Sequence, residues 1–383
     1  MSTKKQHAPI VKELIDMIAK NGWQKKFEEA LKKAQSYKIE AMADLKTLDD
    51  YFDWLDKQLT WIPTENCQGK EVYEHVCKFY FILDQSPVKE LQNAVVPHDK
   101  MEPLTQLSDW MVRFVREFGA FMDTPESITP ESEKTFYDSP IYNMDEYDRP
   151  RGGWKTYNQM FGRYLKPGMR PIAAITDQSV IVSPADSTFD GQWEIRSNTH
   201  VNIKGIEWKI EELLEGSPYK DRFKGGTWCH SFLNTFDYHR EHAPVGGKVL
   251  EARVIQGTAY LEVNPELVPN DTDGKHKLTM KRIFDAPDNP GYEFMQTRGL
   301  VVIESEIGLV AVLPMGMAQV SSIVVTCQEG TTLRKGEEIS YFQFGGSDIV
   351  MVFERASNVC ITAQPGVHYR MGTAIAKAYP ENK

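Results

Sequence analysis

The amino-acid sequence predicts an α+β protein, with a helical N-terminal domain followed by a mostly antiparallel β-barrel or sandwich domain. Apolar residues recur at helical spacing up to about residue 123, and short β-branched runs separated by turn residues begin near residue 175. The first pattern is typical of amphipathic helices and the second of antiparallel sheets. Four prolines within residues 124–153 indicate a linker. We therefore predict domains over residues 1–123 and 154–383, joined by a linker over residues 124–153.

The helical prediction depends on one-sided apolar stripes. Ile10, Leu14 and Ile18 recur every four residues, and an aromatic set around residue 114 repeats that spacing. The stretches KTLDDYFDWLDKQLTW and KEVYEHVCKFYFIL supply two more such stripes. Stripes of this kind bury against one another, so we interpret these aromatic side chains as core and assign no chemistry to this region.

The β prediction depends on short runs rich in Val and Ile. GIEWKIEELLEG predicts one helix among them, and NPELVPNDTDGKHKLTMKRIFDAPDNPG predicts a long loop because it is polar and rich in proline. The runs predicted as strands are SVIVSP, KVLEARVIQGTAYLEV, GLVVIES, GLVAVLP, SSIVVT and DIVMVFE.

Composition excludes several classes of function. The 383 residues carry 44 basic and 54 acidic side chains, a net charge of −10, which argues against a nucleic-acid surface and against electrostatic docking on anionic lipid. No apolar run reaches the roughly 18 residues of a membrane helix, and the first residues lack the pattern of a signal peptide. The five cysteines are scattered without a CxxC pair, which predicts reduced thiols, a cytoplasmic location and no metal site.

Three segments of the β region carry candidate chemistry. VSPADS places Asp186 after a strand, DYHREHAPVGGKV places His239 and His242 three residues apart, and FGGSDIVMVFE places Ser347 at the start of a strand. Each residue alone has an ordinary structural role, but together they offer the acid, base and hydroxyl of an activated nucleophile. No G-x-S-x-G elbow supports a hydrolase. Gly346, which precedes the serine, leaves its own carbonyl uncrowded.

The order of these motifs resembles the phosphatidylserine decarboxylase family of pyruvoyl enzymes. The matching stretches run from about residue 154 to 375 and include FKGGTWCHSFLNTFDYHREHAPVGGKV, GMAQVSSIVVT and RKGEEISYFQFGGS. The whole chain resembles a soluble branch that includes fungal L-tryptophan decarboxylases, which also carry a helical N-terminal domain.

The resemblance implies self-cleavage between Gly346 and Ser347, which converts the serine into a pyruvoyl group that serves as the cofactor. It assigns His242 as the base that activates Ser347, Asp186 as the residue that orients this base, and His239 as a proton donor in decarboxylation. The substrate amine would form a Schiff base with the pyruvoyl ketone. The two chains produced by cleavage are expected to stay associated, and a homodimer is left open.

The chain departs from the family pattern around the predicted pocket. Ser187 stands where the family usually has glycine, Asp348 follows the serine where Thr or Ser is commoner, and only Arg298 is kept from an Asn-Glu-Arg stretch. These departures favour a free aromatic amino acid, such as L-tryptophan, as the small-molecule substrate. The alternatives are a phosphatidylserine decarboxylase that makes phosphatidylethanolamine and an uncleaved, non-enzymatic binding module.

The aromatic residues of the β region are candidates for walls of this substrate pocket. Trp208, Trp228 and Phe232 stand near the matching motifs. Core packing is the more ordinary role for each of them.

Overall fold

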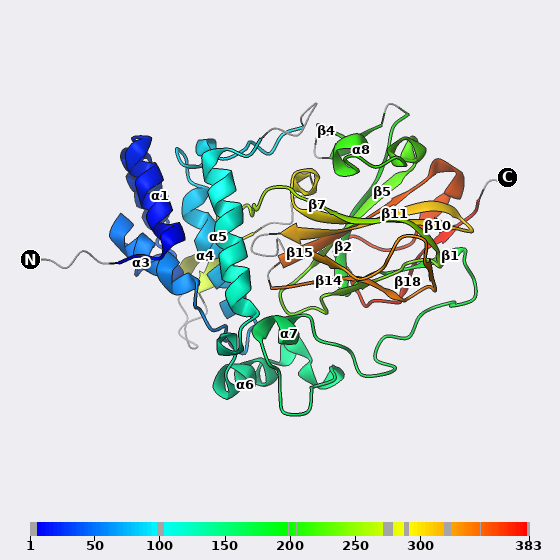
Figure 1. Ribbon diagram of the computed structural model, residues 1–383, viewed down its shortest axis with the longest axis horizontal. Helices are drawn as coiled ribbons and strands as arrows, with labels where there is room; N and C mark the ends of the chain where they lie inside the picture. The colour runs from blue at the N-terminus through cyan, green and yellow to red at the C-terminus, as the bar shows by residue number, and fades with distance from the viewer. Residues whose placement is uncertain are drawn as a thin grey trace, which may run out of the picture.

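The computed structural model describes residues 6–97, 103–197, 199–203, 205–270, 279–286, 291–317, 323–344 and 346–380. Most of the helices gather on one side of the molecule and the main sheet lies on the other, as Figure 1 shows, so the α+β prediction is confirmed. No helix in these ranges is both long and apolar enough to span a membrane. The α-helices are α1 Pro9–Lys20, α2 Gln24–Ser36, α3 Leu48–Gln58, α4 Glu71–Leu83, α5 Gln106–Met122, α6 Pro130–Asp138, α7 Tyr157–Phe161 and α8 Ile210–Leu213.

Helices α1, α3, α4 and α5 form where the apolar stripes predict them. Thr47 caps α3 by accepting from the Asp50 amide, and the Asp50 side chain accepts from the Thr47 amide in return. Such a capping box satisfies amides that have no partner within the helix. Between α1 and α5, the Trp110 indole donates a 2.8 Å hydrogen bond to the Ile10 carbonyl within a buried core.

The predicted linker contains regular structure. Pro125, Pro130 and Pro140 are the first residues of η3 Pro125–Ser127, α6 and η4 Pro140–Tyr142, and η5 Met144–Glu146 follows. A proline is well suited to this position because the first amide of a helix has no acceptor within it. The predicted linker therefore contains short helices, three of which begin at these prolines. Phe136 and Tyr142 are buried in the same core as the N-terminal helices.

The strands form an open arrangement. Among the described residues, eight strands make the main sheet in the order β13-β7-β10-β11-β15-β5-β2-β17, with small sheets beside it. Its two ends are distinct, so this part of the chain is a set of open antiparallel sheets and not a closed barrel. The strands are β1 Val180–Val182, β2 Ser187–Glu194, β3 His200–Ile203, β4 Ile206–Lys209, β5 Thr227–Leu233, β6 Arg240–His242, β7 Gly247–Ile255, β8 Asn264–Asn270, β9 Thr279–Asp285, β10 Arg298–Ser305, β11 Gly308–Met317, β12 Ile323–Val325, β13 Thr332–Leu333, β14 Glu338–Phe342, β15 Gly346–Phe353, β16 Val359–Ile361, β17 His368–Tyr369 and β18 Ala374–Ala378.

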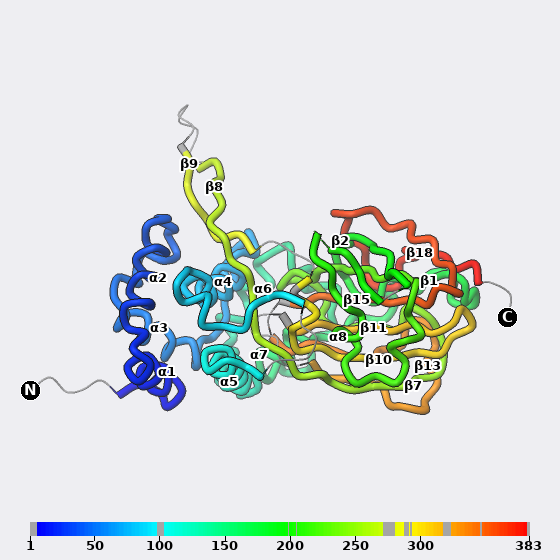
Figure 2. The backbone as a smooth tube through the Cα atoms, turned by 90° about the horizontal axis from the view of Figure 1, so that it is seen from above, coloured from blue at the N-terminus to red at the C-terminus, as the bar shows by residue number. Residues whose placement is uncertain are grey.

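Two local predictions in the β region are wrong. The GIEWKIEELLEG stretch begins as strand β4, and its helix α8 is only four residues long. The expected long loop instead contains the antiparallel pair β8 and β9, which extends from the body in Figure 2. Phe284 of β9 packs against Phe81 of α4, with ring centroids 5.1 Å apart, and this contact attaches the strand pair to the helices. Residues 271–278 and 287–290 of the predicted loop lie outside the described residues.

Phe344 joins the helices to the strand that carries the candidate serine. Its ring centroid lies 5.6 Å from that of Phe118 in α5, 6.0 Å from that of Trp61, and 5.3 Å from that of Tyr157 in α7. A fourth ring, Phe161, lies 5.6 Å away. We call these five residues the aromatic anchor. Because Phe344 is buried within it, the anchor fixes the chain three residues before Ser347.

The aromatic anchor predicts a large stability loss on truncation. The test uses a Ser347→Ala background, which removes the hydroxyl expected to start self-cleavage. In this background, Phe344→Ala is expected to lower the free energy of unfolding by about 3–5 kcal/mol. Urea denaturation measures the change. The control is Tyr379→Ala, since Tyr379 is 56% exposed and its loss should cost within about 0.5 kcal/mol. Equal losses in the two variants would contradict the role of the anchor.

Candidate active site

Ser347 lies at the buried start of β15. This strand runs between β11 and β5, and Ser347 pairs with Gly316 on one side and Leu233 on the other. The side chain is fully buried, and its Oγ has no hydrogen-bond partner among the described residues. Side chains alternate along a strand, so Ser347 shares a face with Ile349, whereas Asp348 points to the opposite face.

His239 presents an unprotonated ring nitrogen in a buried place. Its Nδ1 lies 2.9 Å from the carbonyl oxygen of Asp237, so Nδ1 carries the proton and donates it. The ring stacks on Phe161 at 4.0 Å, and Nε2 has no partner among the described residues. Burial lowers the pKa of His239 to about 3, which keeps the ring neutral. The His239 carbonyl accepts from the Phe342 amide, which ties this residue to the end of β14.

His242 has both ring nitrogens engaged. Its Nδ1 lies 2.8 Å from the Gly336 carbonyl, to which it donates, and its Nε2 accepts from the Tyr238 hydroxyl at 2.9 Å. Burial lowers the pKa of His242 as well. The structure therefore gives His239 an unprotonated nitrogen without a hydrogen-bond partner among the described residues, while the corresponding nitrogen of His242 is occupied. Neither ring forms a hydrogen bond with Ser347 within the described ranges.

Asp186 is held by an arginine and a backbone amide. Arg170 Nε donates to its carboxylate at 2.9 Å and 3.0 Å, and the Met371 amide donates at 2.7 Å. The His242 amide bonds to the Pro184 carbonyl at 2.8 Å, so the Asp186 and His242 segments are neighbours. Within the described residues, no hydrogen bond joins the Asp186 side chain to either histidine.

Asp186 also faces a small cavity. This cavity has a volume of about 400 Å³, and Asp237 and His368 line it as well. His368 Nε2 and Asp237 Oδ1 are 2.9 Å apart, and the hydrogen bond to Asp237 raises the pKa of His368. The structure thus brings Asp186 together with a second acid–histidine pair that the sequence analysis did not select.

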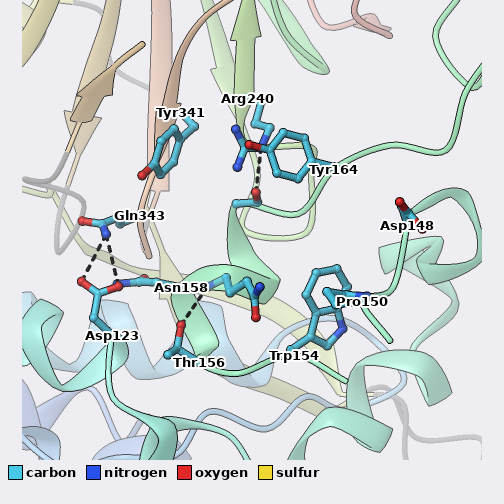
Figure 3. Close-up of a pocket in the computed structure, with 12 residues that line it drawn as sticks. Asp123, Asp148, Pro150, Trp154, Thr156, Asn158, Tyr164, Arg240, Tyr341 and Gln343 are labelled. Atoms are coloured by element: carbon cyan, nitrogen blue, oxygen red, sulfur yellow. Dashed lines mark hydrogen bonds between the residues drawn. The ribbon is translucent and has the colours of Figure 1, made fainter. Parts of the chain in front are cut away.

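A larger aromatic pocket lies beside the segment that leads into Ser347. Its volume is about 470 Å³, and Figure 3 shows Arg240, Tyr164 and Tyr341 across from Trp154. The Arg240 guanidinium lies 3.5 Å from the ring centroid of Tyr164 and 4.6 Å from that of Tyr341. Gln343, which stands four residues before Ser347 in the chain, also lines this cavity. We call this cavity the aromatic pocket.

The aromatic residues considered as pocket walls from the sequence lie elsewhere. Trp208 and Trp228 are buried in the core around Phe294, and Phe232 pairs with Asp348 between β5 and β15. Core packing, the more ordinary role, is thus what the structure gives the two tryptophans. The residues that line the aromatic pocket come from the end of α5, from residues 148–164 including α7, from β6, and from the end of β14 and the residue after it. No periodic pattern marks such positions.

Sequence reasoning also missed a buried cluster on the other face of β15. His230 Nε2 lies 3.1 Å from Glu293 Oε1 and 3.6 Å from Asp348 Oδ2, and all three side chains are fully buried. His230 Nδ1 lies 3.4 Å from Asp190 Oδ2. The only signal in the sequence was Asp348 itself, which stands where the resemblance favours Thr or Ser. We call His230, Glu293 and Asp348 the buried triad.

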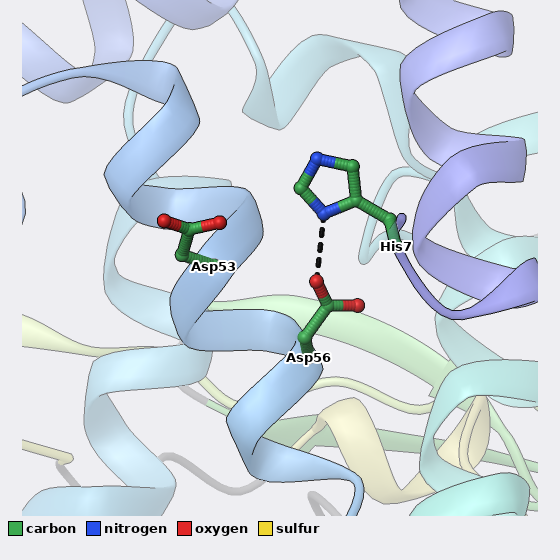
Figure 4. Close-up of side chains that lie close together, drawn as sticks. All are labelled: His7, Asp53 and Asp56. Atoms are coloured by element: carbon green, nitrogen blue, oxygen red, sulfur yellow. Dashed lines mark hydrogen bonds and ion pairs between the residues drawn. The ribbon is translucent and has the colours of Figure 1, made fainter. Parts of the chain in front are cut away.

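A second cluster, far from Ser347, has a structural explanation. In Figure 4, His7 points toward Asp56 of α3, and the His7 Nδ1 to Asp56 Oδ2 distance is 2.7 Å. The Ala8 amide also donates to Asp56, at 2.9 Å. These bonds fasten the residues before α1 to α3. The three side chains, with Asp53 as the third, are only partly buried.

Comparison with known proteins defines the class to which this fold and site belong. A family model described as phosphatidylserine decarboxylase matches residues 157–377, which is more than half of the chain and includes every candidate site residue. Relatives with this description are named as proenzymes. The family that this model describes is one of pyruvoyl-dependent carboxy-lyases, in which the cofactor forms from the chain itself. The chain belongs to the phosphatidylserine decarboxylase family.

Individual relatives differ in how much they share with this chain. A phosphatidylserine decarboxylase proenzyme 3 from Schizosaccharomyces pombe is 37% identical over 232 residues, which cover 57% of this chain but only 22% of that protein. The proenzyme from Fusobacterium nucleatum is 32% identical over 249 residues, covering 65% of this chain and 73% of that protein. The decarboxylase iboD of Amanita muscaria is 28% identical over 251 residues. The chain spans less than a quarter of the fission-yeast relative.

The residues present fit a self-generated pyruvoyl group. The group would arise from Ser347, whose Oγ is buried without a hydrogen-bond partner in the described part of the chain. The preceding residue, Gly346, has no side chain to shield the carbonyl that the hydroxyl must reach. A buried, unpaired hydroxyl beside an uncrowded carbonyl is the chemical starting point that such a conversion needs.

The buried neutral state of His239 predicts a pH dependence of stability. An unfolded histidine has a pKa near 6.5, whereas folding lowers the pKa of His239 to about 3. Between these values the unfolded chain binds a proton that the folded chain does not, so stability falls as the pH falls. The slope from this residue is at most about 1.4 kcal/mol per pH unit. In the Ser347→Ala background, His239→Gln should make the slope between pH 6 and 4 shallower.

The matched control for this measurement is His75, far from Ser347 in the sequence. Its ring stacks on Trp61 at 3.6 Å, and burial lowers its pKa to about 3 as well. His75→Gln should therefore flatten the same slope in urea denaturation series. A His239→Gln slope equal to that of the parent would show that His239 is not buried in the neutral form.

Proposed function

We propose that this chain is a self-cleaving, pyruvoyl-dependent decarboxylase of a free aromatic amino acid. The observation that carries the proposal is the place of Ser347. It follows a glycine at the buried start of β15, within the region that matches the family model. When present, the pyruvoyl group supplies an electron sink for loss of carbon dioxide, and the protein supplies position and electrostatics.

Self-cleavage needs a base, and it proceeds through an ester to a pyruvoyl group with uptake of one water and release of ammonia. A neutral imidazole takes the Ser347 hydroxyl proton, Oγ bonds to the Gly346 carbonyl carbon, and the peptide C–N bond breaks to leave an ester and a free amine. Removal of the Ser347 α-proton then breaks the ester C–O bond and releases the Gly346 carboxylate. One water adds to the resulting enamine as ammonia leaves. An unassisted serine is a poor nucleophile, which is why the base is required.

Two histidines compete for the role of this base. We assign it to His242, with Asp186 to orient it and His239 to donate a proton during decarboxylation, on the family resemblance. In the uncleaved chain the Nε2 of His242 accepts from Tyr238, so that bond must break first. His239, whose Nε2 has no partner among the described residues, is the second candidate for the same step.

The two cleavage products should remain one folded unit. The small product would begin at residue 347 and carry β15, β16, β17 and β18. Of these, β15 pairs with both β11 and β5, which belong to the large product. Breaking one peptide bond at the end of a strand leaves these ladders intact. The hydrogen bonds and the buried apolar side chains of β15 then hold the two chains together.

The aromatic pocket supports the choice of substrate. Trp154, Tyr164 and Tyr341 offer ring faces, and Arg240 adds a cation beside them. Aromatic side chains pack favourably against such rings, and a volume of about 470 Å³ falls within the range of small-molecule sites. Tyr341 and Gln343, which line the pocket, stand six and four residues before Ser347 in the chain.

A phosphatidylserine decarboxylase is the second candidate function. The relative that is 37% identical is named as such an enzyme, and so are the relatives from Oryza sativa and Fusobacterium nucleatum. These names support decarboxylation of a serine headgroup as strongly as the pocket supports a free amino acid. Direct assay of both substrates decides between them.

We expect the purified chain to cleave itself into two products. The small product should span residues 347–383, which is 37 residues, and should resist Edman degradation because its amino group has been lost. Intact mass spectrometry measures both products. Ser347→Ala should remain one chain, since it removes the attacking hydroxyl.

The matched control is Ser231→Ala, which removes a buried serine hydroxyl from the neighbouring strand β5. This variant should still cleave. Wild-type protein that stays intact after prolonged incubation would contradict self-cleavage and would favour the uncleaved binding module.

The cleaved protein should release carbon dioxide from L-tryptophan first, followed by phenylalanine and tyrosine. N-acetyl-tryptophan should be inert because the reaction requires a free amine. Tyr164→Ala should raise KM for tryptophan about 2- to 10-fold, which corresponds to one lost ring contact. Tyr379→Ala, a tyrosine of similar exposure outside the pocket, is the control. Faster turnover of phosphatidylserine in detergent micelles would identify the lipid enzyme instead.

A further inference from the structure

The buried triad has the geometry of a metal site. The ligand atoms of His230, Glu293 and Asp348 all lie within 4.8 Å of one another, and two of the separations are 3.1 and 3.6 Å. Around a metal with ligand distances near 2.0–2.2 Å, neighbouring ligands are about 3–3.6 Å apart. One imidazole nitrogen and two carboxylates are donors that suit first-row divalent metals.

The surroundings of the triad orient each donor inward. His230 stacks parallel to Trp228, with 4° between the ring planes, and its Nδ1 faces Asp190. Asp190 sits at a bulge of β2, between the pairs Phe189–Ser231 and Gly191–His230. A bulge re-aims a side chain, and a carboxylate on the far nitrogen is the usual support of a metal-bound histidine.

Charge favours a cation at this place. Neither oxygen of Asp348 has a hydrogen-bond partner among the described residues, although the side chain is fully buried. Glu293 is fixed by the Gly291 amide, which donates to its Oε2, so Oε1 faces His230. Two fully buried carboxylates beside one histidine are costly without neutralisation.

We propose that His230, Glu293 and Asp348 bind one first-row divalent metal ion, such as Zn²⁺ or Mn²⁺, next to the Gly346–Ser347 junction. Asp348 follows Ser347 directly, so the ion would hold the second residue of the small chain. The pyruvoyl-bearing end would thereby be fixed from the face of β15 opposite to Ser347. The cysteine spacing on which the expectation of no metal site was based carries no information about these ligands, because none of them is a cysteine.

Metal binding can be tested without any activity assay. Wild-type protein and Ser347→Ala, both stripped with chelator, are titrated with Zn²⁺ and with Mn²⁺ against a competing indicator, and bound metal is counted by mass spectrometry. We expect about one equivalent in each protein and a higher Tm with metal. Because Ser347→Ala cannot form the pyruvoyl group, its result does not depend on the proposed function.

Three variants make the test specific. Second-sphere loss typically costs about 10–100-fold in affinity, which is the weakening expected for Asp190→Asn. Asp348→Asn should weaken binding more than that, because it removes a ligand. Glu251→Gln changes a buried carboxylate that instead contacts Ser217 and Arg253, and it should bind metal like the wild type.

Two results would overturn the metal site. The first is no bound metal above background in stripped wild-type protein loaded with either ion. The second is Asp348→Asn with unchanged affinity. Either result would show that the buried triad is a proton-sharing hydrogen-bond network.

Discussion

The position of β15 between β11 and β5 is the constraint on which the rest of the structure depends. A strand that pairs on both sides cannot shift without breaking two ladders, so Ser347 is held at a fixed height in the sheet. The chain before it is fixed separately, because the aromatic anchor buries Phe344. The Gly346–Ser347 peptide thus lies between two parts of the chain that are held by separate sets of contacts.

The alternation of side chains along β15 divides the chemistry between two faces. Ser347 points to the face of Ile349, and Asp348 points to the face of His230. Groups that act on the serine hydroxyl and groups that hold the residue after it are therefore separated by the sheet itself. A substitution at Asp348 therefore changes the charge on the face of β15 opposite to the Ser347 side chain. It does not block the approach to the Ser347 hydroxyl. An aspartate in place of the commoner Thr or Ser thus alters the electrostatics beside the serine and not the access to it.

The periodicity of apolar residues predicted most helices and strands, because apolar stripes and β-branched runs indicate which face of an element is buried. The prolines of residues 124–153 misled because the start of a helix is the one place in it where proline costs little. For the candidate site, motifs selected Asp186, both histidines and Ser347, but not the side chains that contact them. Tyr238 on His242 and Arg170 on Asp186 are contacts between side chains that no spacing encodes. The buried triad comes from three separate segments, and Asp348 was the only sign of it in the sequence.

The helical domain is part of this site and not an appendage. The family model begins at residue 157, yet Trp61 and Phe118, which contact Phe344, lie before it. Asp123 at the end of α5 also accepts from the Gln343 side chain at 3.2 Å. It follows that the helical domain fixes residues 343 and 344, which lie just before the proposed cleavage position, so changes in this domain can tune the proposed processing without touching a candidate catalytic residue.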